Sequence, residues 1–219
     1  PKAYEEMVEK RIKERIPLQY LLGTQEIMGH SFVVTPDVFI PRQDTETVLE
    51  EVIATGIQPE KILDLCTGSG CIAISLALFF QPKICIGTDI SEKALEIAKE
   101  NGKRLCPMVE FIQSDLFENV EGTYDLIISN PPYITSEECR KLMPEVRDHE
   151  PMLALDGKDD GLFFYRKIIR EASGYLKAGG MLAFEIGYDQ GNAVKEMMEE
   201  SGFHDVKIKK DLAGLERMV

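Results

Sequence analysis

Short apolar runs alternate with amphipathic stretches along most of the chain from residue 61 onward. Five of the runs have the length and composition of buried strands, namely 61–66, 83–89, 108–113, 124–130 and 180–187. Four of the stretches have apolar side chains at helical spacing, namely 70–80, 91–101, 161–176 and 189–201. Because strands and helices alternate, the pattern predicts an α/β fold with a parallel sheet and right-handed crossovers.

The residues before this region have a different pattern. Residues 1–16 have apolar positions at helical spacing, with acidic side chains first and basic side chains last, and Pro17 ends the predicted helix. Residues 26–34 predict a small hairpin with a glycine-containing turn. A second amphipathic helix through 48–53 is expected to end at Gly56.

Two stretches in the second half of the chain complete the pattern. Residues 205–219 predict two strands joined across a turn at 212–214. The longest stretch without a regular pattern is 134–160, which contains prolines and many charges. Loops of this length in a compact domain are usually functional or mobile.

The charge balance narrows the choice of partners. The chain has 219 residues and a formal net charge of −13, which argues against a large nucleic-acid-binding face. Its basic cluster at Lys207, Lys209 and Lys210 is more typical of a solvated strand edge. Five cysteines without a Cys-x-x-Cys pair predict neither a disulfide framework nor a metal site, and so a reducing, cytoplasmic location. No stretch is long enough for a membrane span, so no membrane partner is expected.

The main nucleotide-binding signal follows the first of these strands. Residues 62–73 pass from a strand through Gly68 and Gly70 into a helix, a spacing that permits a tight turn and close approach of a ligand. Asp89 ends the next strand, where an acid can accept hydrogen bonds from ribose hydroxyls. A nicotinamide dinucleotide and an adenosyl sulfonium compound both fit these features. Asp64 favours the second, because a carboxylate repels a pyrophosphate and attracts a cation.

The fourth strand runs directly into Asn130-Pro131-Pro132-Tyr133. Two consecutive prolines end a strand and fix its direction, and ligands bind at this edge of open α/β sheets. Suppose that the cofactor is S-adenosylmethionine and that the acceptor is a planar NH2 group. The nitrogen lone pair is then delocalised, and the catalyst must accept hydrogen bonds from both N–H groups. The Asn130 side-chain oxygen and the Pro131 carbonyl can do so, while Tyr133 covers the planar group.

These motifs resemble those of the protein-glutamine methyltransferases that modify peptide-chain release factors, the HemK/PrmC family. The core motifs, which DNA and RNA amino-methyltransferases share, are Asp64 to Gly70, Asp89 to Ser91 and Asn130 to Tyr133. The likeness covers nearly the whole chain, since it continues at 17–23, 40–46, 150–155, 160–162 and 184–187. Two positions depart from the family pattern. Cys66 stands where glycine is usual, which limits the backbone to negative φ unless it is strained, and Gln43 stands where proline is usual.

The resemblance implies a class I S-adenosylmethionine-dependent methyltransferase fold, which is Rossmann-like with a seven-stranded, mostly parallel sheet and a reversed last strand. It implies S-adenosylmethionine as cofactor and a release factor as protein substrate, methylated on the glutamine amide of its Gly-Gly-Gln motif in translation termination. The implied cofactor-binding residues are Asp64, Cys66, Thr67, Gly68, Ser69, Gly70, Asp89, Asp115, Leu116 and Asn130. The implied catalytic and substrate-binding residues are Asn130, Pro131, Pro132 and Tyr133, supported by Arg42 and Glu46.

The resemblance also implies a division of the chain. Residues 1–16 would be the remnant helix of an N-terminal helical domain, 17–43 a hairpin linker and 44–219 the catalytic domain. Because the helical domain of the family helps to engage the release factor, we expect this chain to bind its substrate weakly.

Three other functions fit parts of the sequence. A DNA or RNA amino-methyltransferase would use the same corner on adenine or cytosine, but it predicts a basic groove that the acidic balance disfavours. A nicotinamide-dependent oxidoreductase shares the glycine loop and Asp89, but it gives the Asn130 corner no role. A non-catalytic binding module would keep the fold without needing an intact Asn130.

Overall fold

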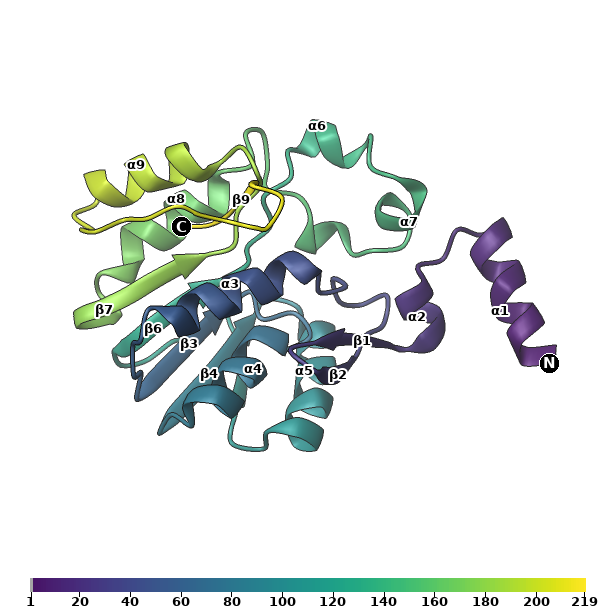
Figure 1. Ribbon diagram of the computed structural model, residues 1–219, viewed down its shortest axis with the longest axis horizontal. Helices are drawn as coiled ribbons and strands as arrows, with labels where there is room; N and C mark the ends of the chain where they lie inside the picture. Colours follow the sequence, from purple (N-terminus) through teal and green to yellow (C-terminus); the bar gives the residue numbers. More distant parts are fainter. Residues whose placement is uncertain (1) are drawn as a thin grey trace.

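A five-stranded parallel sheet forms the centre of the computed structural model, which describes residues 2–219 (Figure 1). The strand order is β5-β4-β3-β6-β7, formed by Glu110–Gln113, Ile84–Asp89, Lys61–Leu65, Tyr124–Ser129 and Leu176–Phe184. The central strands β3 and β6 are buried on both faces, which explains their continuous apolar composition. All five predicted strands are confirmed. β7 begins before residue 180 because Leu176 already pairs with Tyr124 ahead of a register shift.

Helices cover both faces of this sheet. They are α3 (Gln43–Ala54), α4 (Cys71–Phe80), α5 (Glu92–Leu105), α8 (Phe163–Ala172) and α9 (Gly191–Glu200). Successive strand residues point to opposite faces. Ile62 and Leu126 accordingly belong to the apolar cluster on the side of α3 and α4, whereas Leu63 and Ile127 belong to the cluster with α8 and α9. The predicted α/β architecture is therefore confirmed.

The C-terminal strands join the edge of the sheet in the opposite direction. β8 (Lys209–Lys210) and β9 (Glu216–Met218) form an antiparallel pair, as predicted. At the end of β7, Phe184 N donates to Val219 O at 2.7 Å, and two residues further on Ile186 N donates to Arg217 O at 3.0 Å. The expected seven-stranded sheet is thus a parallel sheet of five strands with a reversed two-stranded hairpin attached, because β9 meets the chain after β7 through a single bridge.

The N-terminal elements lie at the other side of the molecule (Figure 1). They are α1 (Lys2–Lys13), α2 (Leu18–Leu22) and the hairpin of β1 (Thr24–Ile27) and β2 (His30–Val33). Buried Asn101 of α5 anchors the hairpin, because its Oδ1 accepts from Val33 N at 2.7 Å. Asn101 Nδ2 donates to Val33 O at 3.0 Å and to Ser69 O at 2.9 Å, so the hairpin is tied to the loop after β3. The division of the chain into remnant helix, linker and catalytic domain stays a prediction.

Residues 134–160, here named the covering segment, lie beyond the carboxyl ends of the strands (Figure 1). The segment was predicted to be irregular, but it contains α6 (Ser136–Cys139), α7 (Pro144–Arg147) and a 3-10 turn, η1 (Met152–Ala154). Ile134 N donates to Leu155 O at 3.0 Å and Gly157 N donates to Ile134 O at 2.7 Å. These bonds bring the two ends of the segment together, so that it forms a closed loop over the sheet.

Candidate active site

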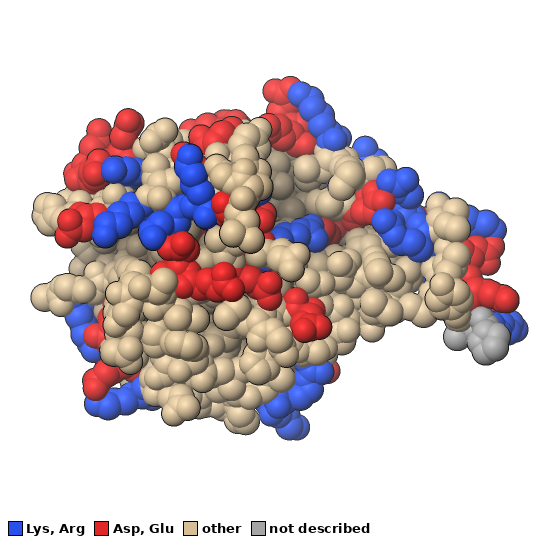
Figure 2. Space-filling model, in the orientation of Figure 1, with Lys and Arg blue, Asp and Glu red and all other residues tan. Residues whose placement is uncertain are grey.

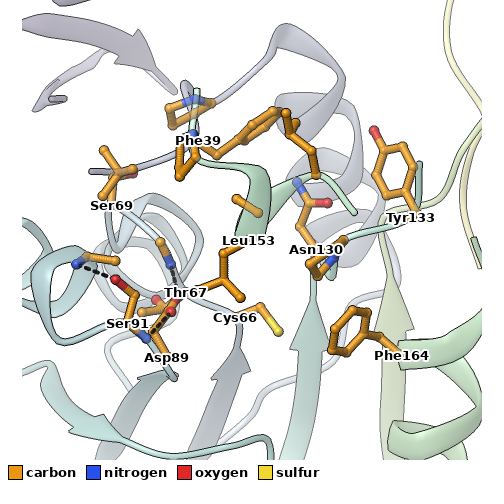
Figure 3. Close-up of a pocket in the computed structure, with 18 of the residues that line it drawn as sticks. Phe39, Cys66, Thr67, Ser69, Asp89, Ser91, Asn130, Tyr133, Leu153 and Phe164 are labelled. Atoms are coloured by element: carbon orange, nitrogen blue, oxygen red, sulfur yellow. Dashed lines mark hydrogen bonds between the residues drawn. The ribbon is translucent and has the colours of Figure 1, made fainter. Parts of the chain in front are cut away.

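A cavity of about 770 Å³ opens at the carboxyl ends of β3, β4 and β6 (Figure 3). This volume lies in the range of small-molecule sites. The cavity is lined by Asp89 after β4 and Asn130 after β6, together with parts of residues 37–45 and of the covering segment. In Figure 3, Asp89 and Asn130 lie on opposite sides of the cavity, with Cys66 and Leu153 between them.

Most of the predicted site residues meet in this one cavity. Those that line it are Cys66, Thr67, Gly68, Ser69, Asp89, Asp115, Leu116, Asn130, Pro132 and Tyr133. Two predicted residues, Asp64 and Gly70, lie behind the lining, and Pro131 stands between the lining residues Asn130 and Pro132. Residues that the sequence placed in different motifs thus form one site, because parallel strands end at the same edge of the sheet.

The glycine loop after β3 has a left-handed backbone at three positions. Cys66 has φ +59°, Gly68 φ +54° and Gly70 φ +81°. A non-glycine residue is strained there, so the cysteine that replaces the usual glycine is accommodated at an energetic cost of about 1–2 kcal/mol. Gly70 is also closely packed, because an added Cβ would lie 3.0 Å from the Phe111 ring.

Asp64 shapes this loop from below. Its side chain is fully buried, and Oδ2 accepts from Thr67 Oγ1 at 2.6 Å and from Ala73 N at 3.1 Å. Burial raises the pKa of the carboxyl to about 7, against the opposing effect of these two hydrogen bonds. The structure places Asp64 under the loop, where it holds the turn in shape, and its attraction of a cationic ligand stays a prediction.

Asp89 links the glycine loop to the next strand. Its Oδ2 accepts from Gly68 N at 2.9 Å and its Oδ1 accepts from Ser91 N at 2.9 Å (Figure 3). Burial raises the pKa of this carboxyl, while the two backbone N–H groups lower it. Each carboxylate oxygen keeps acceptor capacity for a further hydrogen bond, so Asp89 can receive the hydroxyls of a ribose.

The residues after β5 form the far end of the cavity. Leu116 is buried and has φ +52°, and Ser114 Oγ donates to its carbonyl at 2.8 Å. Asp115 is half-exposed, and its Oδ1 lies 3.7 Å from Nζ of Lys167 in α8. Asp115 and Leu116 thus both line the cavity, and their contact with an adenine stays a prediction.

The corner after β6 is supported from behind by distant parts of the chain. Gln190 Nε2 donates to Tyr133 O at 3.0 Å, and Gln190 Oε1 accepts from Gly187 N at 2.9 Å. Gly157 and Gly161 leave no room beside Tyr133, because a Cβ on Gly157 would lie 2.7 Å from Tyr133 Cα and a Cβ on Gly161 would clash with Tyr133 O. Burial also raises the pKa of the Tyr133 phenol. The corner is therefore a rigid part of the fold.

An ion pair beside the cavity joins segments far apart in the sequence. Arg42 pairs with Glu150 of the covering segment and lies over the Phe39 ring, 4.6 Å from its centroid. Glu150 Oε2 also accepts from Ile40 N at 3.2 Å. Burial raises the pKa of the Glu150 carboxyl, and Arg42 lowers it. Arg42 therefore fastens the covering segment to residues 37–45, and its supporting role in the reaction stays a prediction.

Glu46 has a different place from the one predicted. Its Oε1 accepts from Met28 N at 2.6 Å and so stabilises the turn between β1 and β2, where Met28 has φ +50°. The side chain supports the hairpin and does not line the cavity. The sequence around Glu46 does not predict this contact, because the partner is a backbone N–H in another element.

Sequence reasoning missed several residues that complete the site. Phe39, Leu153 and Phe164 line the cavity, Gln190 supports the corner, and buried Glu185 accepts from Thr45. Phe39 lies in an apolar triplet between two prolines, a signal that could have marked it. Gln190 and Glu185 act through contacts over long sequence distances, which no local pattern contains.

The cavity fits the adenosyl ligand that the sequence predicts. Gly68 lines it, and a Cβ there would meet no atom within 4 Å, so the missing side chain leaves open space at the wall. Ser69 also lines it and has a buried hydroxyl without a hydrogen-bond partner. An unpaired hydroxyl and two acidic side chains, Asp89 and Asp115, suit the polar groups of a nucleoside bearing an amino-acid arm.

Comparison with known proteins decides the family. The family model "Methyltransferase small domain" matches residues 32–146. The release factor glutamine methyltransferase of Geobacter sulfurreducens is 44% identical over 97% of this chain and 75% of the relative, and that of Fusobacterium nucleatum is 43% identical over 98% and 62%. The chain belongs to the release factor glutamine methyltransferase family. This confirms the resemblance that the motifs suggested.

A solved structure agrees with the family at the level of the fold. A methyltransferase from Pyrococcus furiosus matches 98% of this chain and 94% of its own length, with a TM-score of 0.64 and 21% sequence identity. The class I methyltransferase fold is therefore confirmed. The oxidoreductase alternative gave the Asn130 corner no role, and the family and the fold both disfavour it.

Two further features concern the described part of the chain. Within residues 2–219, no three His, Cys, Asp or Glu side chains are grouped so that they could hold a metal ion. No helix of this described part is both long and apolar enough to cross a membrane. The cytoplasmic location stays a prediction.

Proposed function

We propose that this protein transfers a methyl group from S-adenosylmethionine to the side-chain amide nitrogen of the glutamine in the Gly-Gly-Gln motif of peptide-chain release factors. The observation that carries the proposal is the single cavity lined by both the Asn130 corner and the glycine loop with Asp89. The names of the relatives from Geobacter and Fusobacterium support the substrate.

The residues divide into a cofactor half and an acceptor half. The cofactor half consists of residues 64–70 with Asp89 and 115–116, where Asp89 holds the ribose and Leu116 adjoins the adenine. The acceptor half consists of residues 130–133. When bound, S-adenosylmethionine supplies an electrophilic methyl group on a sulfonium sulfur.

The acceptor half must overcome the low nucleophilicity of a primary amide. The amide lone pair is delocalised into the carbonyl, so it points towards a methyl group only when both N–H bonds are turned away. Asn130 Oδ1 accepts from one N–H and the Pro131 carbonyl accepts from the other. Tyr133 covers the flat face and excludes water. Fixed acceptors of this kind act through positioning and preorganised dipoles.

Proton transfer needs no strong base in this arrangement. When bound, the cofactor would give up its methyl group and leave as S-adenosylhomocysteine, with the electron pair of the broken S–C bond on its sulfur. The amide nitrogen that accepts the methyl group would then carry a proton far more acidic than before. Asn130 and Pro131 already accept hydrogen bonds from this nitrogen, and the proton leaves from there to solvent. The absence of a catalytic histidine from the cavity lining agrees with this sequence of steps.

Surface charge favours a protein substrate over a nucleic acid. Figure 2 shows a band of acidic side chains over α3, which carries Asp44, Glu46, Glu50 and Glu51. The basic residues of the C-terminal hairpin lie beside this band, and Lys209 pairs with Glu51 at 2.6 Å while Arg217 pairs with Asp44 at 3.2 Å. The lysine cluster is thus partly neutralised, and nucleic acid needs a continuous basic face.

The test uses this chain with radiolabelled S-adenosylmethionine. We would offer a release factor, the same factor with the glutamine of Gly-Gly-Gln replaced by alanine, and duplex DNA and RNA hairpins in parallel. Label on the intact factor alone is the expected result. Label on DNA or RNA would replace the proposal with a nucleic-acid amino-methyltransferase, and label on the substituted factor would show that another residue is the acceptor.

A further inference from the structure

A buried acid lies directly behind the Asn130 corner. Glu185 follows the last residue of β7, is 1% exposed and does not line the cavity. In the parallel register Ser129 pairs with Phe184, and Glu185 N donates to Ser129 O at 3.0 Å. The next residues of the two strands, Asn130 and Glu185, therefore lie side by side with their side chains on the same face.

The two oxygens of the Glu185 carboxyl have different surroundings. Thr45 Oγ1 of α3 donates to Oε2 at 2.7 Å. Oε1 is buried too, but no donor meets it with full hydrogen-bond geometry. A buried carboxylate oxygen without a donor is unfavourable, so a nearby N–H group is drawn to it. Asn130 is near enough for its side chain to lower the pKa of this carboxyl, against burial, which is the larger effect and raises the pKa to about 7.

The side-chain amide of Asn130 has two ends of nearly equal shape but opposite chemistry. Nδ2 only donates hydrogen bonds and Oδ1 only accepts them. Methyl transfer requires Oδ1 to face the N–H of the substrate glutamine. The inverted amide would present a donor to another donor, so half of the catalytic acceptor pair would be lost. Packing alone cannot choose between the two orientations, because they fill the same space.

An ionised carboxylate makes this choice, because it can only accept. We propose that Glu185 is a positioning residue: its Oε1 accepts a hydrogen bond from Asn130 Nδ2 and thereby turns Asn130 Oδ1 towards the substrate amide. The inference rests on the proposed function. Thr45 completes the arrangement, because its hydroxyl occupies Oε2 and leaves Oε1 for Asn130. Glu185 makes no contact with the reacting atoms and acts through Asn130.

The first test replaces the acid with its amide, Glu185→Gln. Glutamine keeps the size and still accepts from Thr45, but its nitrogen can donate to Asn130 Oδ1 and hold the amide inverted. We expect kcat to fall about tenfold or more, as for a lost transition-state hydrogen bond. KM, the Kd for S-adenosylhomocysteine and the melting temperature should change little. Glu196→Gln on the exposed side of α9 is the matched control.

A double-mutant cycle separates positioning from a merely structural role. If Glu185 acts through Asn130, Glu185→Gln should cause no further loss in an Asn130→Ala background. Losses that multiply in the double variant would overturn the proposal, as would a kcat for Glu185→Gln equal to that of the parent. Thr45→Ser and Thr45→Val give a second pair if Glu185→Gln does not fold. The serine variant should keep kcat and the valine variant should lose it, and equal kcat values would overturn the proposal.

A readout without substrate keeps this inference distinct from the proposed function. The side-chain 15N–1H signals of Asn130, assigned by their loss in Asn130→Ala, should shift in Glu185→Gln but not in Glu196→Gln. Unchanged signals would overturn the positioning role even if methyl transfer is observed. If the parent protein labels no release factor but the Asn130 signals still shift in Glu185→Gln, the result would count against the proposed function alone.

Discussion

The two halves of the cavity are held in place over very different distances along the chain. In the cofactor half, the Thr67 hydroxyl donates a hydrogen bond to Asp64, three residues away. Gly68 N donates to Asp89 at the end of the neighbouring strand. In the acceptor half, Gln190 supports Tyr133 from 57 positions away, and Thr45 reaches Glu185 across 140. The cofactor half is thus a local motif that many proteins can share, whereas the acceptor half depends on the complete tertiary structure.

This contrast predicts a separation of effects. Changes in the acceptor half should reduce methyl transfer while cofactor binding survives. Changes in the cofactor half should weaken cofactor binding first. Variants that reduce both properties together would show that the halves are one cooperative unit.

The largest effect is expected for Asn130→Ala. The substitution removes one of the two acceptors for the substrate N–H groups, and we expect the methyl-transfer rate to fall about 10²-fold or more. Single-turnover transfer to a release factor measures the rate, and calorimetry with S-adenosylhomocysteine should give a nearly unchanged Kd. Asn192→Ala on the exposed surface of α9 is the matched control. A near-normal rate for Asn130→Ala would remove the proposed role of the corner.

Gly161→Ala tests the distant support of the corner. A Cβ at this position would clash with Tyr133 O and lie 2.7 Å from Gln190 Nε2. The corner must then move, and displacement of a reacting group by about 1 Å can lower a rate by about 10²-fold. We expect a loss of about tenfold or more in kcat, with little change in cofactor affinity.

Gly214→Ala is the matched control for this variant. Gly214 has φ +82°, close to the +72° of Gly161, but a Cβ there meets no atom within 4 Å. The left-handed backbone destabilises both alanine variants by about 1 kcal/mol. This strain should therefore lower the melting temperature of the two variants by a similar amount. Equal activity of the two variants would show that the Tyr133 carbonyl need not be fixed.

Asp89→Ala should produce the reverse pattern. It removes the acceptor of the Gly68 and Ser91 N–H groups together with the proposed ribose contacts. Hydrogen bonds to a charged group contribute about 1.5–3 kcal/mol, so the Kd for S-adenosylhomocysteine should rise about tenfold or more. The rate at saturating cofactor should change less than the Kd. Glu100→Ala on α5 controls for the loss of a surface acid, and a larger effect on rate than on affinity would contradict the division into halves.

The smallest effect is expected at Cys66. Cys66→Gly relieves a left-handed backbone that costs a non-glycine residue about 1–2 kcal/mol, but glycine loses part of this gain to the entropy of the unfolded chain. Cys66→Ala keeps the strain and removes the sulfur. Chemical denaturation should therefore find the glycine variant more stable than the alanine variant by about 1 kcal/mol. Equal stabilities would show that the φ of +59° is not strained in its surroundings.

Part of the fold could be predicted because its causes are local. The apolar runs that became β3 and β6 are buried on both faces, and such strands are continuous in hydrophobicity. The short helices of the covering segment were not predicted, because four-residue helices such as α6 and α7 have too few positions for a periodic pattern. The number of strands in one sheet was also wrong, since the link of β9 to the chain after β7 is a single bridge.

For the active site, the sequence by itself determined which chemistry was available. The glycine loop, Asp89 and Asn130-Pro131-Pro132-Tyr133 follow the neighbouring strands β3, β4 and β6, and parallel strands necessarily deliver their carboxyl ends to one edge. Only the tertiary structure decided the roles of the supporting side chains. It placed Asp64 beneath the loop, turned Glu46 to the Met28 turn and set Glu185 beside Asn130. The reason is physical: a hydrogen bond depends on atoms within about 3 Å in space, whatever their separation along the chain.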